Sequence, residues 1–305
     1  MNNPPAVLEL LALAWLRELT PADWTRLEAL PELALALPDP DPPLVTELAA
    51  EHLRLLVLNV PPYETCFTDL AGRPPSQVSA AVADLFAHAG WVPPEGSGAV
   101  AADHVGLQLL ALAHLARAGP ARLAHLLTER LAQWMPLLAW SLRRIAPLPF
   151  YSALAEITLD AVLSRLGGPW GLGAHAAGES SVPPAGSSDP DPSLLLSLLL
   201  SPVTAGCYLS RAELARVAQS LCLPVTPGSR RDMLAGLARD AAARDCSKLL
   251  WDALENLLDD AMLDFTGLER EYPHWAPCRR IWSARLTHGL RLVQALRAAP
   301  SHSFA

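Results

Sequence analysis

The sequence is poor in the residues that favour β-strands. Isoleucine occurs three times and aromatic residues make up 6% of the 305 residues, whereas hydrophobic residues, chiefly leucine and alanine, reach 51%. Leucine and alanine are good helix formers, while strands favour β-branched and aromatic side chains. The composition therefore predicts an all-α protein and argues against a β-sandwich, a β-barrel or a Rossmann-type sheet.

Cysteine pairs and long apolar runs are also lacking. The five cysteines are widely spaced and form no Cys-x-x-Cys pair, which argues against a zinc ribbon or a disulfide framework. The apolar stretch near the start is interrupted by Glu9, Arg17 and Glu18, and the run over 194–200 is too short for a bilayer. We therefore expect a cytoplasmic protein with reduced thiols, without a signal peptide and without stable membrane insertion.

Positive charge is scarcer than negative charge. The 23 basic residues, of which only Lys248 is a lysine, stand against 31 acidic residues, so that the net charge is −8. An acidic chain is poorly suited to phosphate backbones, which argues against a nucleic-acid partner. The same charge favours a cationic partner.

The apolar spacing predicts about a dozen helices in two blocks. The blocks cover residues 1–166 and 194–305, and residues 167–193 between them are rich in Gly, Ser, Pro and Ala. This segment is either a linker between two domains or a surface loop of one helical globule. Its length also permits exchange between copies, so that a monomer and a domain-swapped dimer are both compatible with the sequence. The main predicted helices cover 6–19, 44–59, 76–89, 103–118, 121–145, 151–166, 210–221, 229–243, 247–263 and 278–298.

Motifs of catalysis are absent apart from one cluster of acids. The sequence has no nucleophile elbow, P-loop or dinucleotide-binding glycine motif. Asp259, Asp260 and Asp264 could hold Mg²⁺ and a diphosphate, as in helical prenyl-transferring enzymes, but their spacing differs by one residue from that motif. A solvated helix face is the simpler interpretation. We predict a protein that is not an enzyme and that holds no metal or cofactor.

Two short segments have a more distinctive residue pattern than the sequence around them. The first, Asn59–Thr65, ends a predicted helix, and the second, Asp103–Leu109, opens another. A purely structural interpretation is available for both, because Pro61 and Pro62 would stop one helix and Asp103 would cap the next.

Together the two segments resemble the TorD/DmsD/NarJ family of redox enzyme maturation chaperones. The family pattern has a Pro-Tyr-Glu-Ser-like turn, a short helix with a glycine, and an Asp-His pair that opens a long helix. Here these features correspond to Pro62-Tyr63-Glu64-Thr65, to Gly90 before Trp91, and to Asp103-His104. The chain departs from the pattern at Thr65, which replaces Ser, and at Gln108, where the family usually has Glu.

The resemblance implies a TorD-like helical fold and a cytoplasmic chaperone. Such chaperones bind the twin-arginine signal peptide, or the N-terminus, of a molybdopterin oxidoreductase subunit and assist cofactor insertion before export. An apolar groove would take the apolar part of the peptide, and acidic side chains on its rim would attract the arginines. The peptide-binding residues that the motifs suggest are Pro62, Tyr63, Glu64, Trp91, Asp103 and His104.

Within this interpretation each residue has an expected role. Glu64 and Asp103 are expected at the rim, and Tyr63 and Trp91 as apolar walls. His104 either donates to peptide carbonyls or braces its loop. The alternative functions are a helical scaffold for protein interactions without preference for leader peptides, and the Mg²⁺-dependent enzyme described above.

Overall fold

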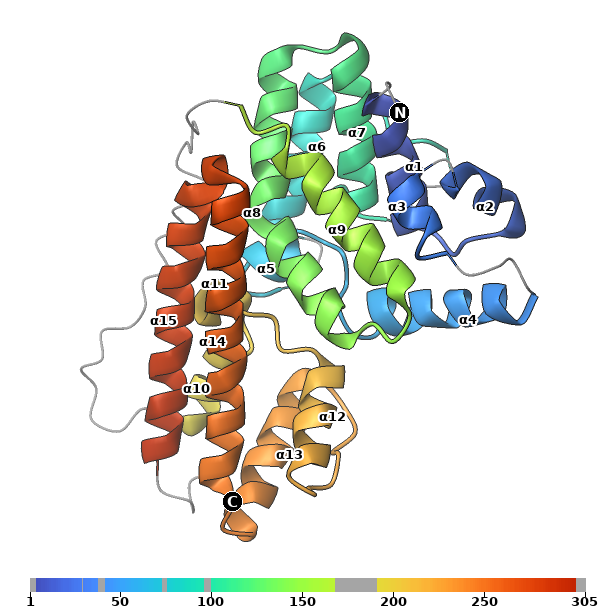
Figure 1. The fold of residues 1–305 in the computed structure, drawn as a ribbon. Helices are drawn as coiled ribbons and strands as arrows, with labels where there is room; N and C mark the ends of the chain where they lie inside the picture. Colours follow the sequence, from blue (N-terminus) through green and yellow to red (C-terminus); the bar gives the residue numbers. More distant parts are fainter. Residues whose placement is uncertain are drawn as a thin grey trace. The chain divides into compact units, whose positions relative to one another are not determined.

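The computed structural model describes residues 4–28, 30–37, 42–72, 76–95, 100–167 and 191–299. Over these ranges the chain consists of helices joined by loops, without a strand, which confirms the all-α prediction. The chain divides into two compact units, Met1–Trp170 and Gly171–Ala305 (Figure 1). Most of the predicted linker, residues 168–190, lies outside the described residues.

The first unit is built from nine α-helices and one π-helix in the described ranges. The long helices are those that the apolar spacing predicted, and α8 continues on both sides of Pro136. The elements are α1 (Pro4–Leu16), α2 (Pro21–Leu27), α3 (Pro31–Ala34), α4 (Pro42–His52), the π-helix η1 (Leu53–Val57), α5 (Thr65–Thr68), α6 (Gln77–His88), α7 (Val105–Ala118), α8 (Ala121–Ile145) and α9 (Pro149–Leu163).

The core of the first unit lies where α1 packs against α7 and where α8 packs against α7 and α9. Large side chains fill it, and Trp15 and Trp134 are almost fully buried. The indole of Trp15 donates to the Thr158 hydroxyl (3.0 Å), which satisfies a polar atom inside the core. The Phe67 ring stacks on Trp134 at a centroid distance of 5.4 Å, so that the short helix α5 is fixed to α8.

The helix predicted over 44–59 ends in an unusual way. Its last turn is the π-helix η1, in which the Leu58 amide donates to the Leu53 carbonyl (3.1 Å) and the Val60 amide to the Leu55 carbonyl (2.7 Å). The Asn59 side chain donates to the Arg54 carbonyl (2.7 Å), which satisfies one of the backbone acceptors at this end. This termination sets the direction in which the chain enters the Pro61-Pro62 turn.

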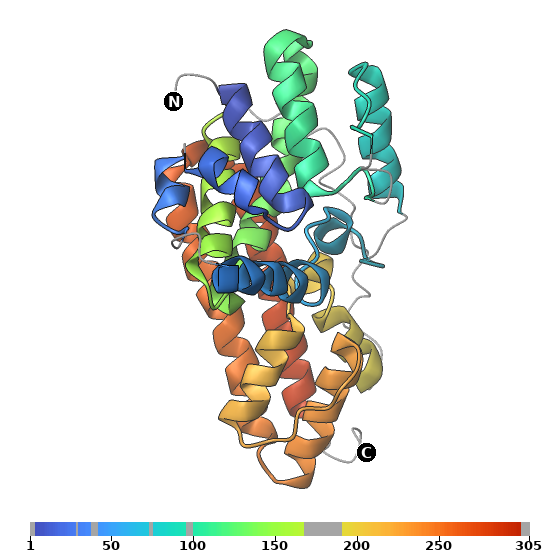
Figure 2. The same ribbon diagram turned by 90° about the vertical axis from the view of Figure 1, so that its right-hand side faces the viewer.

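The second unit is a separate helical bundle. Its longest helices, α14 and α15, lie side by side along much of their length (Figures 1 and 2). Capping boxes begin α12 and α13, and that of α12 is formed by Ser210 and Glu213. The elements are α10 (Pro192–Leu199), α11 (Pro202–Ala205), α12 (Arg211–Ser220), α13 (Arg230–Ala243), α14 (Ser247–Glu271), the 3₁₀ helix η3 (Pro273–Trp275) and α15 (Ala276–Ala298).

One helix of the second unit is longer than predicted. The sequence predicted an end at residue 263, whereas α14 continues to Glu271. The prediction was wrong because Phe265 points into the core (2% exposed) and so extends the apolar face by another turn. The helix ends only where Pro273 restricts the backbone of Tyr272.

Gly206 provides a test of the packing between α11 and α15. Its φ angle is +77°, and a Cβ atom there would lie 2.4 Å from the backbone nitrogen of Leu286. We expect Gly206→Ala to lower the free energy of unfolding by about 2 kcal/mol, because it combines left-handed strain with overpacking. Gly267→Ala is the control, since a Cβ there meets open space on a helix and should be neutral or slightly stabilising. Equal effects of the two substitutions in urea unfolding would contradict this packing.

Candidate functional site

The two motif segments meet in space. Tyr63 and His104 form an isolated antiparallel bridge. The Glu64 amide donates to the Asp103 carbonyl (3.0 Å), and the Val105 amide donates to the Pro62 carbonyl (2.9 Å). We call this pairing of residues 62–65 with residues 103–105 the motif joint.

Asp103 holds the motif joint from the inside. Its side chain is fully buried, and Oδ2 accepts from the Thr65 amide (3.0 Å) and from the Thr65 hydroxyl. Thr65 Oγ1 also bonds Ser76 Oγ (2.6 Å), which in turn accepts from the Ser79 amide and caps α6. The sequence suggested that Asp103 is the N-cap of the following helix. This is wrong, because its carboxylate accepts instead from Thr65, which lies some forty residues earlier in the chain.

Glu64 is buried in the same joint and is already paired. One carboxylate oxygen, Oε2, accepts from Arg130 Nε on α8 (2.9 Å) and from Gln108 Nε2 on α7 (3.1 Å). Burial raises the pKa of the Glu64 carboxyl to about 7, although Arg130 and Gln108 act to lower it. Arg130 also donates to the Val78 carbonyl (3.3 Å), so that it ties α8 to both α5 and α6.

These positions correct the expectation that Glu64 and Asp103 lie on an exposed rim. Both side chains are nearly or fully buried, at 3% and 0% exposure. The physical reason is that each carboxylate has an internal donor, Arg130 for one and Thr65 for the other, and a paired charge can be buried. In this conformation neither carboxylate can reach the arginines of a peptide.

His104 acts on its own helix. It is the N-cap residue of α7, and its Nδ1 accepts from the Gly106 amide (3.1 Å). Burial, together with a smaller effect of the nearby His52, lowers the pKa of the imidazole to about 3, so that the ring is neutral. Of the two predicted roles, this geometry favours bracing of the loop.

The remaining predicted site residues differ in how far they are exposed to solvent. Pro62 is buried, whereas Tyr63 and Trp91 are half-buried. The Tyr63 ring meets the His104 ring edge to face (4.9 Å), and Trp91 packs on Phe86 of α6 (4.7 Å). The structure therefore joins Pro62, Tyr63, Glu64, Asp103 and His104 in the motif joint and seats Trp91 on the end of α6.

The glycine before Trp91 has a conformational role. Gly90 has φ +63° at the end of α6, and the Trp91 amide donates to the Phe86 carbonyl (3.0 Å). This is the pattern of a Schellman helix end, which favours glycine at the left-handed position. Gly90 thereby sets the direction in which the chain leaves α6, and with it the position of Trp91.

The sequence did not point to Arg130 or Ser76 as members of the site, or to the role of Gln108. A signal for Arg130 was present, because it lies on the same helical face as the buried Leu127 and Trp134. A single arginine on an apolar face indicates a buried acidic partner. The identity of that partner, 66 positions away, required the structure.

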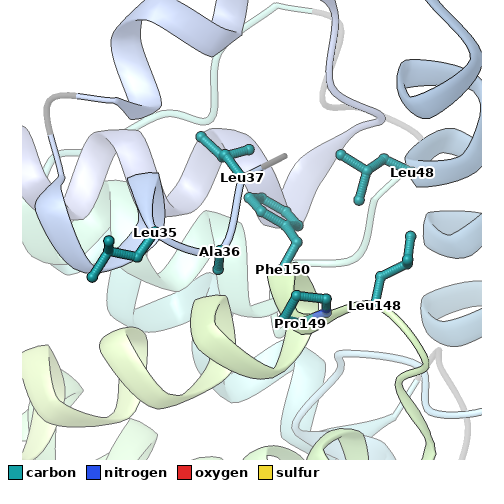
Figure 3. A pocket seen from close by; sticks show the side chains of 7 residues that line it. All are labelled: Leu35, Ala36, Leu37, Leu48, Leu148, Pro149 and Phe150. Carbon is teal, nitrogen blue, oxygen red and sulfur yellow. The ribbon is translucent and has the colours of Figure 1, made fainter. Parts of the chain in front are cut away.

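An apolar pocket opens on the first unit. It has a volume of about 220 Å³, and Figure 3 shows side chains from the segment just after α3, from α4 and from the start of α9 arranged around it. Phe150 forms its buried floor, while Leu35 is 91% exposed at its edge. The lining residues are Leu35, Ala36, Leu37, Leu48, Leu148, Pro149 and Phe150. The sequence pointed to none of them, because they come from three separate segments.

The acidic cluster of the second unit is a solvated helix face. Asp259, Asp260 and Asp264 lie exposed on α14. Among the described residues no group of three or more His, Cys, Asp or Glu side chains is placed to hold a metal ion. In the same ranges no helix has the length and apolar character of a membrane span.

Residues 21–139 match the family model described as nitrate reductase delta subunit, a family of molybdoenzyme maturation chaperones. The matched range contains the whole motif joint, together with Trp91, Gln108 and Arg130. The match supports the predicted resemblance to redox enzyme maturation proteins and points to its nitrate reductase delta branch. Searches of curated proteins and of solved structures give no significant match.

Proposed function

We propose that this chain is a cytoplasmic maturation chaperone that binds the leader peptide or N-terminal segment of a molybdenum-containing oxidoreductase subunit. The observation that carries the proposal is the apolar pocket of the first unit, four of whose lining residues fall within the matched range. A pocket lined by leucine, proline and phenylalanine suits an apolar peptide segment. The chain would hold the subunit while its cofactor is inserted and would itself catalyse no reaction.

The charge distribution supports a peptide with basic residues next to the apolar segment. Residues 1–170 contain 17 acidic residues against 10 arginines and no lysine, so that they carry −7 of the net charge of −8. A negative surface raises the rate at which a cationic peptide is encountered. The unit with the pocket is thus also the unit that would attract a twin-arginine or otherwise basic leader.

We assign two kinds of role to the six motif residues. Tyr63 and Trp91 are the members that a peptide can contact in this conformation, because they are half-buried. Pro62, Glu64, Asp103 and His104 act by holding the motif joint, and they would contact a peptide only if the joint opened.

Substitution in the pocket tests the proposal. We expect Leu35→Asp to weaken binding of a leader peptide at least about tenfold, because a carboxylate would have to be desolvated against an apolar segment. The fold should be unaffected, since Leu35 is 91% exposed. Isothermal calorimetry with the full chain measures the effect.

A matched variant controls for the added charge. Leu263→Asp also places a carboxylate at an exposed leucine (71% exposed), but on α14 of the second unit. Its affinity should equal that of the unsubstituted chain. If both variants bind the peptide equally well, the pocket is not the binding site. If the chain binds folded partners but no leader peptide, the alternative of a general scaffold is supported instead.

A further inference from the structure

We propose that Glu64, together with Asp103, Gln108 and Arg130, forms a buried proton-binding site in the motif joint, in which the Glu64 carboxyl group holds one proton and loses it as the solution becomes alkaline. The proposal concerns the joint itself and does not depend on the identity of any client. Charge balance, hydrogen-bond balance and the surrounding groups support it separately.

The charges of the cluster do not balance when both carboxyl groups are ionised. Glu64 and Asp103 would contribute two negative charges at 3% and 0% exposure, and Arg130 contributes one positive charge. His104 adds none, because its Nδ1 accepts a hydrogen bond and its pKa is far below neutrality. An unbalanced buried charge is costly, and uptake of one proton removes it.

The hydrogen bonds of the cluster show the same deficit. Over the part of the chain that the structure describes, Asp103 Oδ1 and Gln108 Oε1 are buried acceptors without a donor. Gln108 Nε2 is already used by Glu64 Oε2 and by the Asp103 carbonyl (both 3.1 Å). A protonated carboxyl group supplies a donor to a cluster that has too many acceptors.

The groups that face Glu64 come from each neighbouring segment. From α8 comes Arg130, next to Glu129, which pairs with His125 of its own helix (3.1 Å). From the segment before α7 come Asp103, which raises the pKa of Glu64, and the neutral His104. Tyr63 and Cys66 are its neighbours in the sequence, α7 contributes the Gln108 amide, and α6 contributes the Val78 carbonyl through Arg130. Arg130 is the one cation among these groups.

Protonation changes the bonds that hold the joint. The ionised Glu64 carboxylate accepts from Gln108 and pairs with Arg130. The protonated group is neutral and has an O–H donor on one oxygen, so that the hydrogen bond from Gln108 becomes weaker and the ionic attraction to Arg130 is lost. The contact of the motif turn with α7 and α8 therefore depends on pH.

The effect on stability has a defined sign. The pKa of Glu64 is raised from 4.5 to about 7 in the folded chain, so that between these values the folded state binds more protons than the unfolded state. This group therefore makes the free energy of unfolding fall as the pH rises from about 4.5 to about 7. Above about pH 7 its contribution is constant.

Carbon NMR of the full chain with labelled Asp and Glu carboxyl groups tests the site directly. We expect one carboxyl resonance to titrate near pH 7 in the unsubstituted chain and to be absent or shifted in Glu64→Gln. Glu51→Gln is the matched control, because Glu51 is equally buried and pairs with Arg54 (2.7 and 2.9 Å) outside the cluster. That variant should retain the near-neutral transition.

A second variant keeps the test independent of the folding of Glu64→Gln. Asp103→Asn removes the neighbouring negative charge and should move the transition of Glu64 to lower pH. If no carboxyl group of the unsubstituted chain titrates above about pH 6, the cluster binds no proton and the proposal fails. It also fails if a near-neutral transition persists unchanged in both Glu64→Gln and Asp103→Asn.

Discussion

Replacing Arg130 by alanine is expected to lower the free energy of unfolding by about 4 kcal/mol at pH 8. The substitution leaves the Glu64 carboxylate buried without its counter-ion, and loss of one member of a buried ion pair costs about 3–5 kcal/mol. It also removes the donor to the Val78 carbonyl on α6. The side chain that joins three helices of the first unit is thereby lost.

The expected loss depends on pH. Without Arg130 the pKa of Glu64 rises above about 7, because the guanidinium acts to lower it. At about pH 6 the carboxyl is protonated with or without Arg130, so that the destabilisation should be smaller there than at about pH 8. Urea unfolding at the two pH values measures the difference.

A second arginine provides the comparison. Arg54 pairs with the buried Glu51 by two hydrogen bonds, but its own side chain is 37% exposed, against 15% for Arg130. Arg54→Ala should therefore cost less than Arg130→Ala, since water can reach the remaining partner more easily. An equal or smaller cost for Arg130→Ala at both pH values would mean that the Glu64 pair does not hold the joint.

Replacing Asp103 by alanine is expected to lower the free energy of unfolding by about 3 kcal/mol. The buried amide and hydroxyl of Thr65 both donate to Asp103 Oδ2, and each loses its acceptor. An unsatisfied buried donor costs about 1–3 kcal/mol. The link from Thr65 to the Ser76 cap of α6 is disturbed as well.

The conservative variant separates hydrogen bonding from charge. Asp103→Asn keeps one side-chain oxygen as an acceptor and should cost about 1 kcal/mol. Amide hydrogen exchange at Thr65 should accelerate strongly in the alanine variant and weakly in the asparagine variant. If the alanine variant is as stable as the unsubstituted chain, Asp103 has no structural role, and its function would have to be sought in ligand contact.

The sequence predicted the helices where local signals decide their ends. Ser210 with Glu213, and Thr20 with Asp23, are such signals, because each pair forms a capping box within a few residues of the helix start. The extension of α14 to Glu271 was missed because the burial of Phe265 depends on packing within the second unit. Local propensity contains no information on such contacts.

The candidate site was predictable only in part. The motifs identified the segments that meet, but the expected rim position of Glu64 and Asp103 was wrong. Their burial depends on Arg130 and Thr65. From the sequence alone a carboxylate is expected to be exposed, because a partner that lies far away along the chain cannot be recognised. The pocket around Phe150 could not be predicted, because its lining combines three segments that only the fold brings together.

In the proposed function the motifs and the pocket have separate tasks. The motif joint connects α5, α6, α7 and α8 through buried hydrogen bonds, and it lies within the range that matches the nitrate reductase delta family. The pocket has an apolar lining. In the proposed function the joint maintains the unit, and the pocket takes the apolar segment of the client.

Calorimetric titration of the full chain with a client leader peptide is the decisive test of the proposed function. The peptide should combine a basic start with an apolar stretch, as in the leader or N-terminus of a molybdenum-containing oxidoreductase subunit, and a scrambled peptide of the same composition is the control. We expect saturable one-to-one binding with a negative heat-capacity change, which marks burial of apolar surface, and weaker binding of the scrambled peptide. Equal binding of the two peptides, or no binding of either, would contradict it.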